Sequence, residues 1–275
     1  MAYILSTEKQ TAAIAALCEG TSIRAIERMT GIHRDTIMRL GIRVGEACGR
    51  MHDERMRELN CTHIQADEVW GFVGKKQKSA TLDEQNAGKG DVWTFVAFDP
   101  ESKLVPSYLV GKRDFKHTYH FVSDLASRMR SRIHLSTDGM QEYRATIAEA
   151  FGSDVDYGQI VKVYGAPDGV DAARRYSPPR ITSIRKMSIR GEPDHAEIST
   201  SLVERQNLTM RMHMRRLTRL TNAFSKKVEN FRAAVSLHFA YYNFVKMHGT
   251  IRCTPALQAG VADRVWTVGD LLELA

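Results

Sequence analysis

The chain has few cysteines and no long apolar run, and both shortages exclude classes of protein. Four of its 275 residues are cysteine, and none of them forms a Cys-x-x-Cys pair. This excludes a disulfide framework and a standard zinc ribbon. No apolar run approaches the length of a transmembrane helix, and the N-terminus MAYILSTEKQ lacks the basic and apolar regions of a secretory signal. We therefore expect no membrane partner and a cytoplasmic location.

Two of the cysteines belong to a weaker candidate metal site. Cys48, His52, Cys61 and His63 could in principle surround a zinc ion. Their spacing fits no common zinc template, so reduced and partly buried thiols are the simpler interpretation.

Acidic residues are absent from the stretch where basic residues are dense. The chain has a formal net charge of +7 and a pI near 9.3. Between residues 205 and 227 there are seven Lys or Arg residues and no Asp or Glu. Charge concentrated in this way indicates a polyanionic partner such as DNA. With 43% hydrophobic residues, the chain is long enough for one catalytic domain and a small module.

Residues 1–50 are predicted to form the small module, which is entirely helical. Three segments have helical spacing, and the turn TGI separates the second from the third. Gly31 can adopt the left-handed conformation that ends a helix, and this order resembles a helix-turn-helix. Arg34 and Arg39 would then face outward to contact DNA. Glu27 stands where the motif usually has a small residue, so a helical packing or dimerisation module is the alternative.

The hydrophobic period changes from helical to strand-like at about residue 62, after a polar linker helix over 51–61. The order of the following elements is βββαβαβ and then a helix. This order is expected of a ribonuclease H-like fold, a mixed α/β sheet flanked by helices, in which the first and fourth strands are neighbours. The predicted elements are strands at 63–73, 92–98 and 104–110, a helix at 115–129, a strand at 133–137, a helix at 143–151 and a strand at 160–164.

Three carboxylates in separate structural contexts are the candidate catalytic residues. Asp67 lies in the first strand, Asp138 ends a short apolar strand at a glycine, and Glu204 begins the basic helical stretch. The fold brings Asp67 and Asp138 together if the first and fourth strands are neighbours. Acids are costly to gather unless metal ions neutralise them, so the set indicates a two-metal phosphodiester site.

Alternatives to two of these acids remain open. Because neighbouring strand residues point to opposite faces, Asp67 and Glu68 are not expected in one site unless the strand is irregular. Periodicity alone does not choose between them. Asp138 could equally be a turn or N-cap residue before Gly139.

The basic stretch has two helical faces. At 100° per residue, five residues, three of them arginines, fall within an arc of roughly 80° on one side of the helix. Four apolar residues cluster on a separate face. A carboxylate beside arginines suits a phosphate or a metal site, although an arginine stripe is usually a solvated face. Arg211 could hold a phosphate, and Asn207 is a polar neighbour of the site. The arc contains Glu204, Leu208, Arg211, Arg215 and Arg219, and the apolar face contains Val203, Met210, Met214 and Leu217.

Two lysines follow the first strand in a polar loop. Lys75 and Lys76 are candidates for contacts with the DNA backbone. A solvated loop without a partner is the equal alternative.

Several of these segments resemble a known family. ADEVWGFVGKK, WTFVAFDPESKLVPSYLVGKRD, STDG with the following Tyr143, and LVERQNLTMRMHMRRLTRLTNAFSKKVEN are similar to the transposases of the bacterial insertion sequence one family. The resemblance implies a DDE transposase with a ribonuclease H-like catalytic domain over 62–258. It implies two Mg²⁺ ions, with Mn²⁺ as a substitute, bound by Asp67, Asp138 and Glu204. It also implies binding to terminal inverted repeats and target DNA, a homodimer or larger assembly, and a bacterial, nucleoid-associated location.

Two features depart from the family. Residues 165–199 form an apparent insertion or long loop, so Glu192 or Glu197 could rival Glu204 as the third acid. The family's cysteine-rich N-terminal zinc module is not evident.

The tail over 259–275 is apolar enough to pack or to mediate oligomer contacts. A sequence-specific DNA-binding regulator, as a decayed or domesticated transposase, and a ribonuclease H-like nuclease or junction resolvase are the alternative functions.

Overall fold

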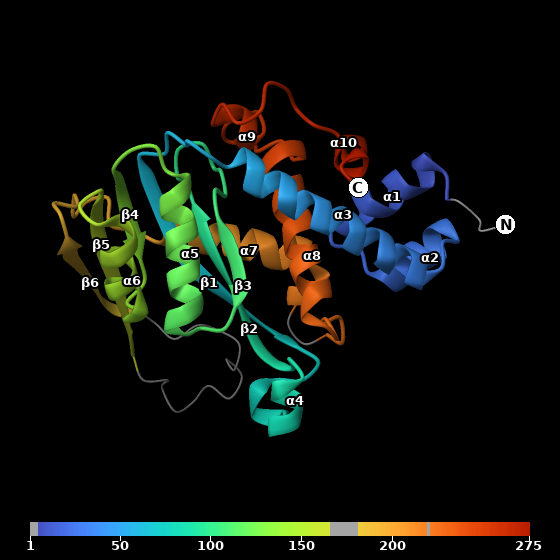
Figure 1. Cartoon of the computed structure of the whole chain (residues 1–275), viewed down its shortest axis with the longest axis horizontal. Coiled ribbons are helices and arrows are strands. Elements are labelled where there is room, and N and C mark those ends of the chain that lie inside the picture. The colour runs from blue at the N-terminus through green and yellow to red at the C-terminus, as the bar shows by residue number, and fades with distance from the viewer. Residues whose placement is uncertain (1–4, 166–180, 219–220) are drawn as a thin grey trace.

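A mixed β-sheet forms one side of the computed structural model, which describes residues 5–165, 181–218 and 221–275 (Figure 1). Within these residues the sheet has six strands in the order β3-β2-β1-β4-β5-β6. β1 pairs antiparallel with β2 and parallel with β4. The predicted pairing of the first and fourth strands is confirmed, and with it the ribonuclease H-like class. The strands are β1 (His63–Val73), β2 (Gly90–Phe98), β3 (Tyr108–Gly111), β4 (Ile133–Thr137), β5 (Val155–Tyr164) and β6 (Ile181–Arg190).

The helices precede, interrupt and follow the sheet along the chain. α5 and α6 cover one face of the sheet, and α7 lies behind the other (Figure 1). Before the sheet come α1 (Thr7–Cys18), α2 (Ile23–Thr30) and α3 (Arg34–Arg55). Within it come a 3₁₀ turn (Gln77–Ser79), α4 (Leu82–Asn86), α5 (Phe115–Arg128) and α6 (Glu142–Phe151). After it come α7 (Ser201–His213), a 3₁₀ turn (Arg215–Leu217), α8 (Val228–Ala240), a π-helical turn (Tyr241–Val245), α9 (Pro255–Gln258) and α10 (Val268–Glu273).

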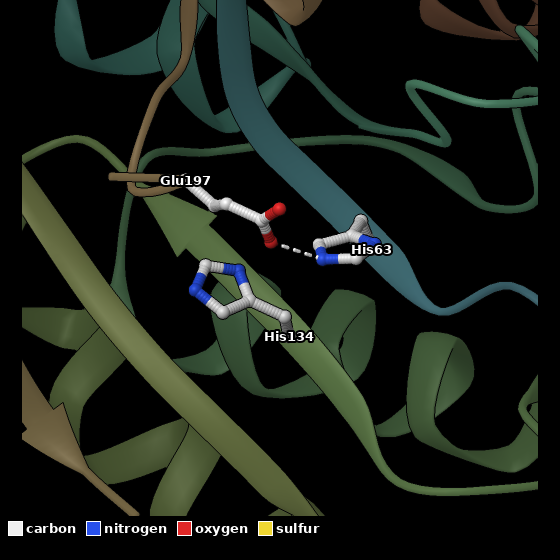
Figure 2. A group of neighbouring side chains, drawn as sticks. All are labelled: His63, His134 and Glu197. Carbon is white, nitrogen blue, oxygen red and sulfur yellow. Dashed lines mark ion pairs between the residues drawn. The ribbon is translucent and has the colours of Figure 1, made fainter. Parts of the chain in front are cut away.

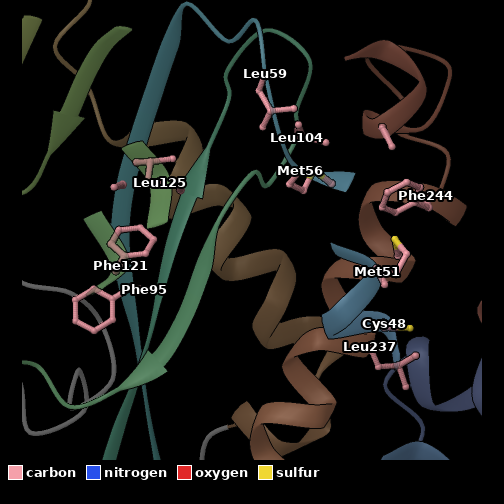
Figure 3. Packing of buried hydrophobic residues seen from close by; sticks show 14 of the residues in the cluster. Cys48, Met51, Met56, Leu59, Phe95, Leu104, Phe121, Leu125, Leu237 and Phe244 are labelled. Carbon is pink, nitrogen blue, oxygen red and sulfur yellow. The ribbon is translucent and has the colours of Figure 1, made fainter. Parts of the chain in front are cut away.

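Alternation along β1 divides its side chains between two hydrophobic cores. Ile64 and Ala66 belong to the core on the α5 side, where Phe95 and Phe121 are buried (Figure 3). Val69 belongs to the core that contains residues of α7 and α8. Odd-numbered residues of β1 therefore face α7, and even-numbered residues face α5 and α6.

The first three helices have the predicted helix-turn-helix order. Gly31 ends α2 with φ of 69°, and its N–H donates to the carbonyl oxygen of Glu27, so the expected left-handed glycine is present. Ile26 and Ile37 are fully buried and hold α2 and α3 together. The chain forms no separate linker helix over 51–61, because α3 continues without a break to Arg55.

α3 packs along α8, which joins the N-terminal helices to the rest of the chain. Cys48 and Met51 are buried here beside Leu237 (Figure 3). At Gly45 the backbones approach so closely that a Cβ atom would lie 2.1 Å from the carbonyl oxygen of Ala233. Only glycine fits this contact without a shift of one helix.

We expect Gly45→Ala to destabilise the chain by about 1–3 kcal/mol, the usual cost of overpacking, despite the better helix propensity of alanine. The atom it meets is backbone and cannot rotate away. Gly49→Ala in the same helix is the matched control, because its Cβ would meet only the side chain of Ser236, with the hydroxyl oxygen at 3.2 Å. The control should be neutral or up to about 1 kcal/mol more stable. Urea unfolding followed by circular dichroism compares them, and equal free energies of unfolding would contradict the close packing.

The stretch over 165–199, predicted as an insertion or long loop, contains a strand instead. β6 pairs antiparallel with β5 at the edge of the sheet, and β5 itself begins at Val155, five residues before the prediction. Residues 166–180 lie outside the described residues. Most side chains of β6 are exposed or only partly buried. An edge strand of this kind has no buried face, so its sequence lacks the alternation that identifies a strand.

α7 is shorter than the predicted basic face requires. It ends at His213, where Met214 has an extended ψ of 100°, and Arg215 lies in the following 3₁₀ turn. The predicted stripe is therefore interrupted after Arg211, and Arg219 lies outside the described residues. The apolar face is confirmed, since all four of its predicted members are buried: Val203, Met210, Met214 and Leu217.

The C-terminal tail packs within the chain. Trp266 is buried with its ring centroid 4.8 Å from that of Phe244, and α10 contacts α1 and α3. Leu271 of α10 is fully buried. Of the helices in the described ranges, none has the length and apolar character needed to cross a membrane.

Candidate active site

The register of β1 and β4 brings two of the predicted acids together. The last paired residues are Ala66 and Thr137. Asp67 directly follows Ala66, and Asp138 directly follows Thr137, so both acids lie where the pairing of β1 with β4 ends. Carboxylate oxygens of Asp67, Glu68 and Asp138 all lie within 4.8 Å of one another. The structure thus gathers three carboxylates, which we call the acid cluster.

Glu68 belongs to this cluster, contrary to the expectation from strand alternation. β1 is regular here, since Asp67 and Glu68 pair in sequence with Val96 and Phe95 of β2. The two side chains do start from opposite faces. However, β4 ends at Thr137, so no strand lies beside Asp67 and Glu68 on that edge of β1. Their carboxylates therefore both reach Asp138, which lies just beyond the end of β4.

Arg113 is a member of the site that the sequence did not indicate. Its guanidinium donates from Nε to Glu68 at 3.2 Å and from Nη2 to Asp138 at 3.4 Å. It also lies over the ring of Trp93, 5.2 Å from the centroid. Arg113 follows β3, so its role depends on the sheet order and has no local sequence signal. It places one positive charge against the acid cluster.

The acid cluster holds carboxyl groups whose negative charge is unfavourable. Burial, with the nearby charge of Asp138, raises the pKa of Asp67 to about 6 and that of Glu68 to about 8. The Glu68 side chain is only 2% exposed and accepts a hydrogen bond from the Tyr143 hydroxyl. Burial and Glu68 in turn raise the pKa of Tyr143. A bound cation would relieve this repulsion.

Asp138 also has the turn role that was its alternative interpretation. Its Oδ1 accepts from the N–H of Met140 at 3.0 Å. It is not a helix N-cap, because α6 begins after Gln141. The turn bond occupies one carboxylate oxygen and points the other, Oδ2, at Arg113.

α7 lies directly over Asp67. Asn207 donates from Nδ2 to Asp67 Oδ2 at 2.8 Å. The start of α7 is fixed by Gln65, whose Oε1 accepts from the N–H groups of Leu202 and Val203 at 3.0 and 3.1 Å. Since Gln65 and Asp67 are on the same face of β1, one strand both anchors the helix and presents the acid to it.

Glu204 lies outside the acid cluster but close to it. It is one turn before Asn207 on α7, a spacing that puts the two side chains on one helix face. Its charge is among the causes that raise the pKa of Asp67. The Glu204 carboxylate accepts from the Thr200 hydroxyl at 2.6 Å and pairs with the ammonium of Lys162. Neither rival acid, Glu192 or Glu197, belongs to the cluster.

The predicted DNA-binding residues lie on several elements. Arg34 and Arg39 are exposed on α3, and Arg215 is exposed after α7. Arg211 donates to the carbonyl oxygen of Trp70 at 3.4 Å, which places it beside β1. Lys75 is paired with Glu84 at 2.7 Å, and the Lys76 ammonium lies 5.7 Å from the centroid of the Trp70 ring.

The cysteine and histidine set considered for zinc is not assembled. His52 is buried and donates from Nε2 to the carbonyl oxygen of Val105 at 3.1 Å. Burial raises the pKa of Cys48 to about 12, which keeps the thiol protonated. Among the described residues, no group suited to a metal contains Cys48, His52 or Cys61, whereas His63 belongs to a different one.

Comparison with known proteins gives similarities to solved structures but no match to a family. No protein-family model and no curated protein matches the chain. Among solved structures, the chain is similar to a cryo-EM structure of a piggyBac transposase synaptic complex with hairpin DNA. The TM-score is 0.44 with 10% sequence identity, over 98% of this chain and 72% of the other. A similarity of this strength indicates nothing about the activity of this chain, and the resemblance to the insertion sequence one family is not confirmed.

Proposed function

We propose that the chain is a DDE transposase, which cuts and joins DNA at the ends of an insertion sequence. The observation that carries the proposal is the meeting of Asp67 and Asp138 at the end of the β1–β4 pair, beneath the helix that bears Glu204. In this proposal Asp67, Asp138 and Glu204 are the catalytic acids. Asn207 orients Asp67, and Arg211 contacts a DNA phosphate.

The donor atoms at this place fit Mg²⁺. The acid cluster offers carboxylate oxygens, the ligands that this ion prefers. Asn207 Oδ1 is buried without a hydrogen-bond partner, so a further oxygen is available beside Asp67. Asp67, Asp138 and Glu204 would hold two Mg²⁺ ions, or Mn²⁺ in their place. Such ions activate the attacking oxygen and stabilise the leaving oxygen in phosphodiester chemistry.

The reaction requires no nucleophile from the protein. Water attacks the phosphodiester at the element's end and releases a 3′-hydroxyl, which then attacks a target phosphodiester in line. The chain holds the reacting DNA and the acids in position. Because two ends must be held together, we propose a homodimer or larger assembly on DNA, working in the bacterial cytoplasm.

Cleavage of labelled DNA tests this proposal. The tag-free chain is incubated with a duplex that carries the terminal repeats flanking its own coding region and with a target plasmid, in Mg²⁺ or in EDTA. We expect metal-dependent nicks at the repeat ends and joined products. DNA binding without cutting in Mg²⁺ and in Mn²⁺ would instead favour a regulator, and cutting without preference for the ends would favour a nuclease or resolvase.

The exposed arginines of α3 should contribute to DNA binding without affecting folding. We expect the double variant Arg34→Ala/Arg39→Ala to bind end DNA more weakly and to lower the slope of log K against log salt by roughly 1.8, about 0.9 for each lost phosphate contact. Fluorescence anisotropy at several salt concentrations measures the slope.

The matched control removes two exposed arginines outside the N-terminal helices, Arg130→Ala/Arg232→Ala. An equal loss of slope in the control would mean that only net charge matters. In that case the helix-turn-helix would not be the DNA-binding module.

A further inference from the structure

A second group of metal-binding side chains lies at the other end of the β1–β4 pair. His63 and His134 are register partners on the two strands, and Glu197 comes from the segment between β6 and α7. Figure 2 shows the three side chains pointing toward one another. Their ligand atoms lie within 4.8 Å of one another, and the histidine ring centroids are 5.4 Å apart.

The ring of His134 directs one nitrogen toward the other two residues. Figure 2 shows that this nitrogen is next to the ring carbon that joins the chain, which makes it Nδ1, and that it faces Glu197 and His63. The other nitrogen, Nε2, faces away from them, is buried and makes no hydrogen bond. In the neutral ring with its proton on Nε2, the lone pair of Nδ1 is directed toward the group.

The other histidine has the surroundings of a metal ligand. His63 Nε2 pairs with Glu197, while Nδ1 lies 3.3 Å from a carboxylate oxygen of Glu101. Histidines that bind a metal usually have a carboxylate against their far nitrogen, which fixes the orientation of the ring. Glu101 is in turn fixed by the Thr62 hydroxyl at 2.9 Å.

A pocket of about 250 Å³ opens on the group. It is lined by His63, His134, Glu197 and Glu101, together with Gln65 and Ser136. An ion bound by three protein ligands would therefore keep an open position for water or another small ligand.

This group is separate from the acid cluster. His134 and Asp138 are four residues apart along the same chain, which corresponds to roughly 13 Å of extended strand. The ligand chemistry also differs, because imidazole nitrogens favour Zn²⁺ and related transition metals, whereas carboxylates alone suit Mg²⁺.

We propose that His63, His134 and Glu197 form a binding site for a divalent transition metal ion, with Zn²⁺ the best match. The ion ties the segment that leads into α7 to the two central strands. Glu197 lies seven residues before Glu204 in the chain, so the ion would fix the approach of α7 to the sheet. The inference does not rest on the proposed transposase activity.

Zinc titration of the metal-stripped, tag-free chain against a chromophoric chelator tests this site. We expect one tight equivalent per chain, with the affinity reduced at least about 100-fold in His134→Ala and in Glu197→Gln. Glu101→Gln should reduce the zinc affinity about 10- to 100-fold, as changes to the group that orients a metal-binding histidine do. Bound Co²⁺ should give the intense visible absorption of a tetrahedral site in the native chain and lose it in His134→Ala.

Two controls make the result specific. His120→Ala removes an exposed histidine outside the group and should leave binding unchanged. Asp138→Asn alters the acid cluster and should also retain the zinc equivalent. Circular dichroism confirms that each variant is folded, and His134→Gln replaces His134→Ala if the alanine variant is not.

Absence of saturable zinc binding in the native chain would overturn the inference, as would unchanged binding in His134→Ala and Glu197→Gln. Loss of the equivalent in Asp138→Asn alone would assign it to the acid cluster and also overturn the inference. None of these outcomes depends on DNA cleavage, so they leave the proposed function standing.

Discussion

Asp138→Asn is expected to lower end cleavage and strand transfer by on the order of 10³-fold or more. In the proposed site this acid would help to bind the ions, whose charge stabilisation supplies several kcal/mol, at about 1.4 kcal/mol for each factor of ten. Asparagine keeps the shape and can still accept the turn bond from Met140, so the fold should persist. Quantitative gel assays of nicked and joined DNA measure the loss.

Asp154→Asn is the matched control for this prediction. Asp154 is exposed directly before β5, at the opposite end of the parallel strands from Asp138. The same change of charge there should leave cleavage intact, and both variants should bind end DNA as the native chain does. Cleavage by Asp138→Asn within about tenfold of the native rate would remove Asp138 from the catalytic site.

Glu204→Gln is expected to cost on the order of 10²-fold or more in cleavage while hardly changing stability. Its carboxylate is 44% exposed, so losing the ion pair with Lys162 should have little effect on folding. The loss in rate follows if Glu204 is the third acid, since glutamine is a poorer ligand for Mg²⁺.

Glu68→Gln should show the reverse pattern, with a larger loss of stability than of rate. Glu68 is 2% exposed and bonded to Arg113 and Tyr143, and glutamine has only one oxygen with which to accept from both. We expect the cleavage rate of the folded variant to fall about tenfold or less. Urea unfolding and single-turnover cleavage separate the two quantities. A larger rate loss in Glu68→Gln than in Glu204→Gln would make Glu68 the third acid.

The strands with a buried face were predictable from the sequence, and the exposed strand was not. β1 and β4 were predicted with their observed bounds, because apolar residues recur along them with a clear period. β6 was missed because its side chains contact mostly solvent and its sequence carries no such period. The early ending of α7 was also missed, since the run after His213 keeps a helical apolar pattern that continues in the 3₁₀ turn.

The candidate site was only partly predictable for a related reason. The sequence indicated Asp67 and Asp138 because each lies in or directly after a recognisable strand. It did not indicate Arg113, which reaches the acid cluster only because β3 and β2 place the end of β3 near β1. It also excluded Glu68 from the site by an alternation rule that holds for a strand with neighbours on both sides. Asp67 and Glu68 lie beyond the end of β4, where one neighbour is missing.

The sequence by itself determined the order of elements, the buried faces of the strands and the residues that could carry chemistry, because periodicity and residue type are local properties. The tertiary structure alone decided which of these residues meet. The end of β4 opposite Ala66 joins three carboxylates at one end of the strand pair, and the register of His63 with His134 gathers a different ligand set at the other. Both depend on strand register and on where a neighbouring strand ends, and these are set by contacts between residues far apart in the chain.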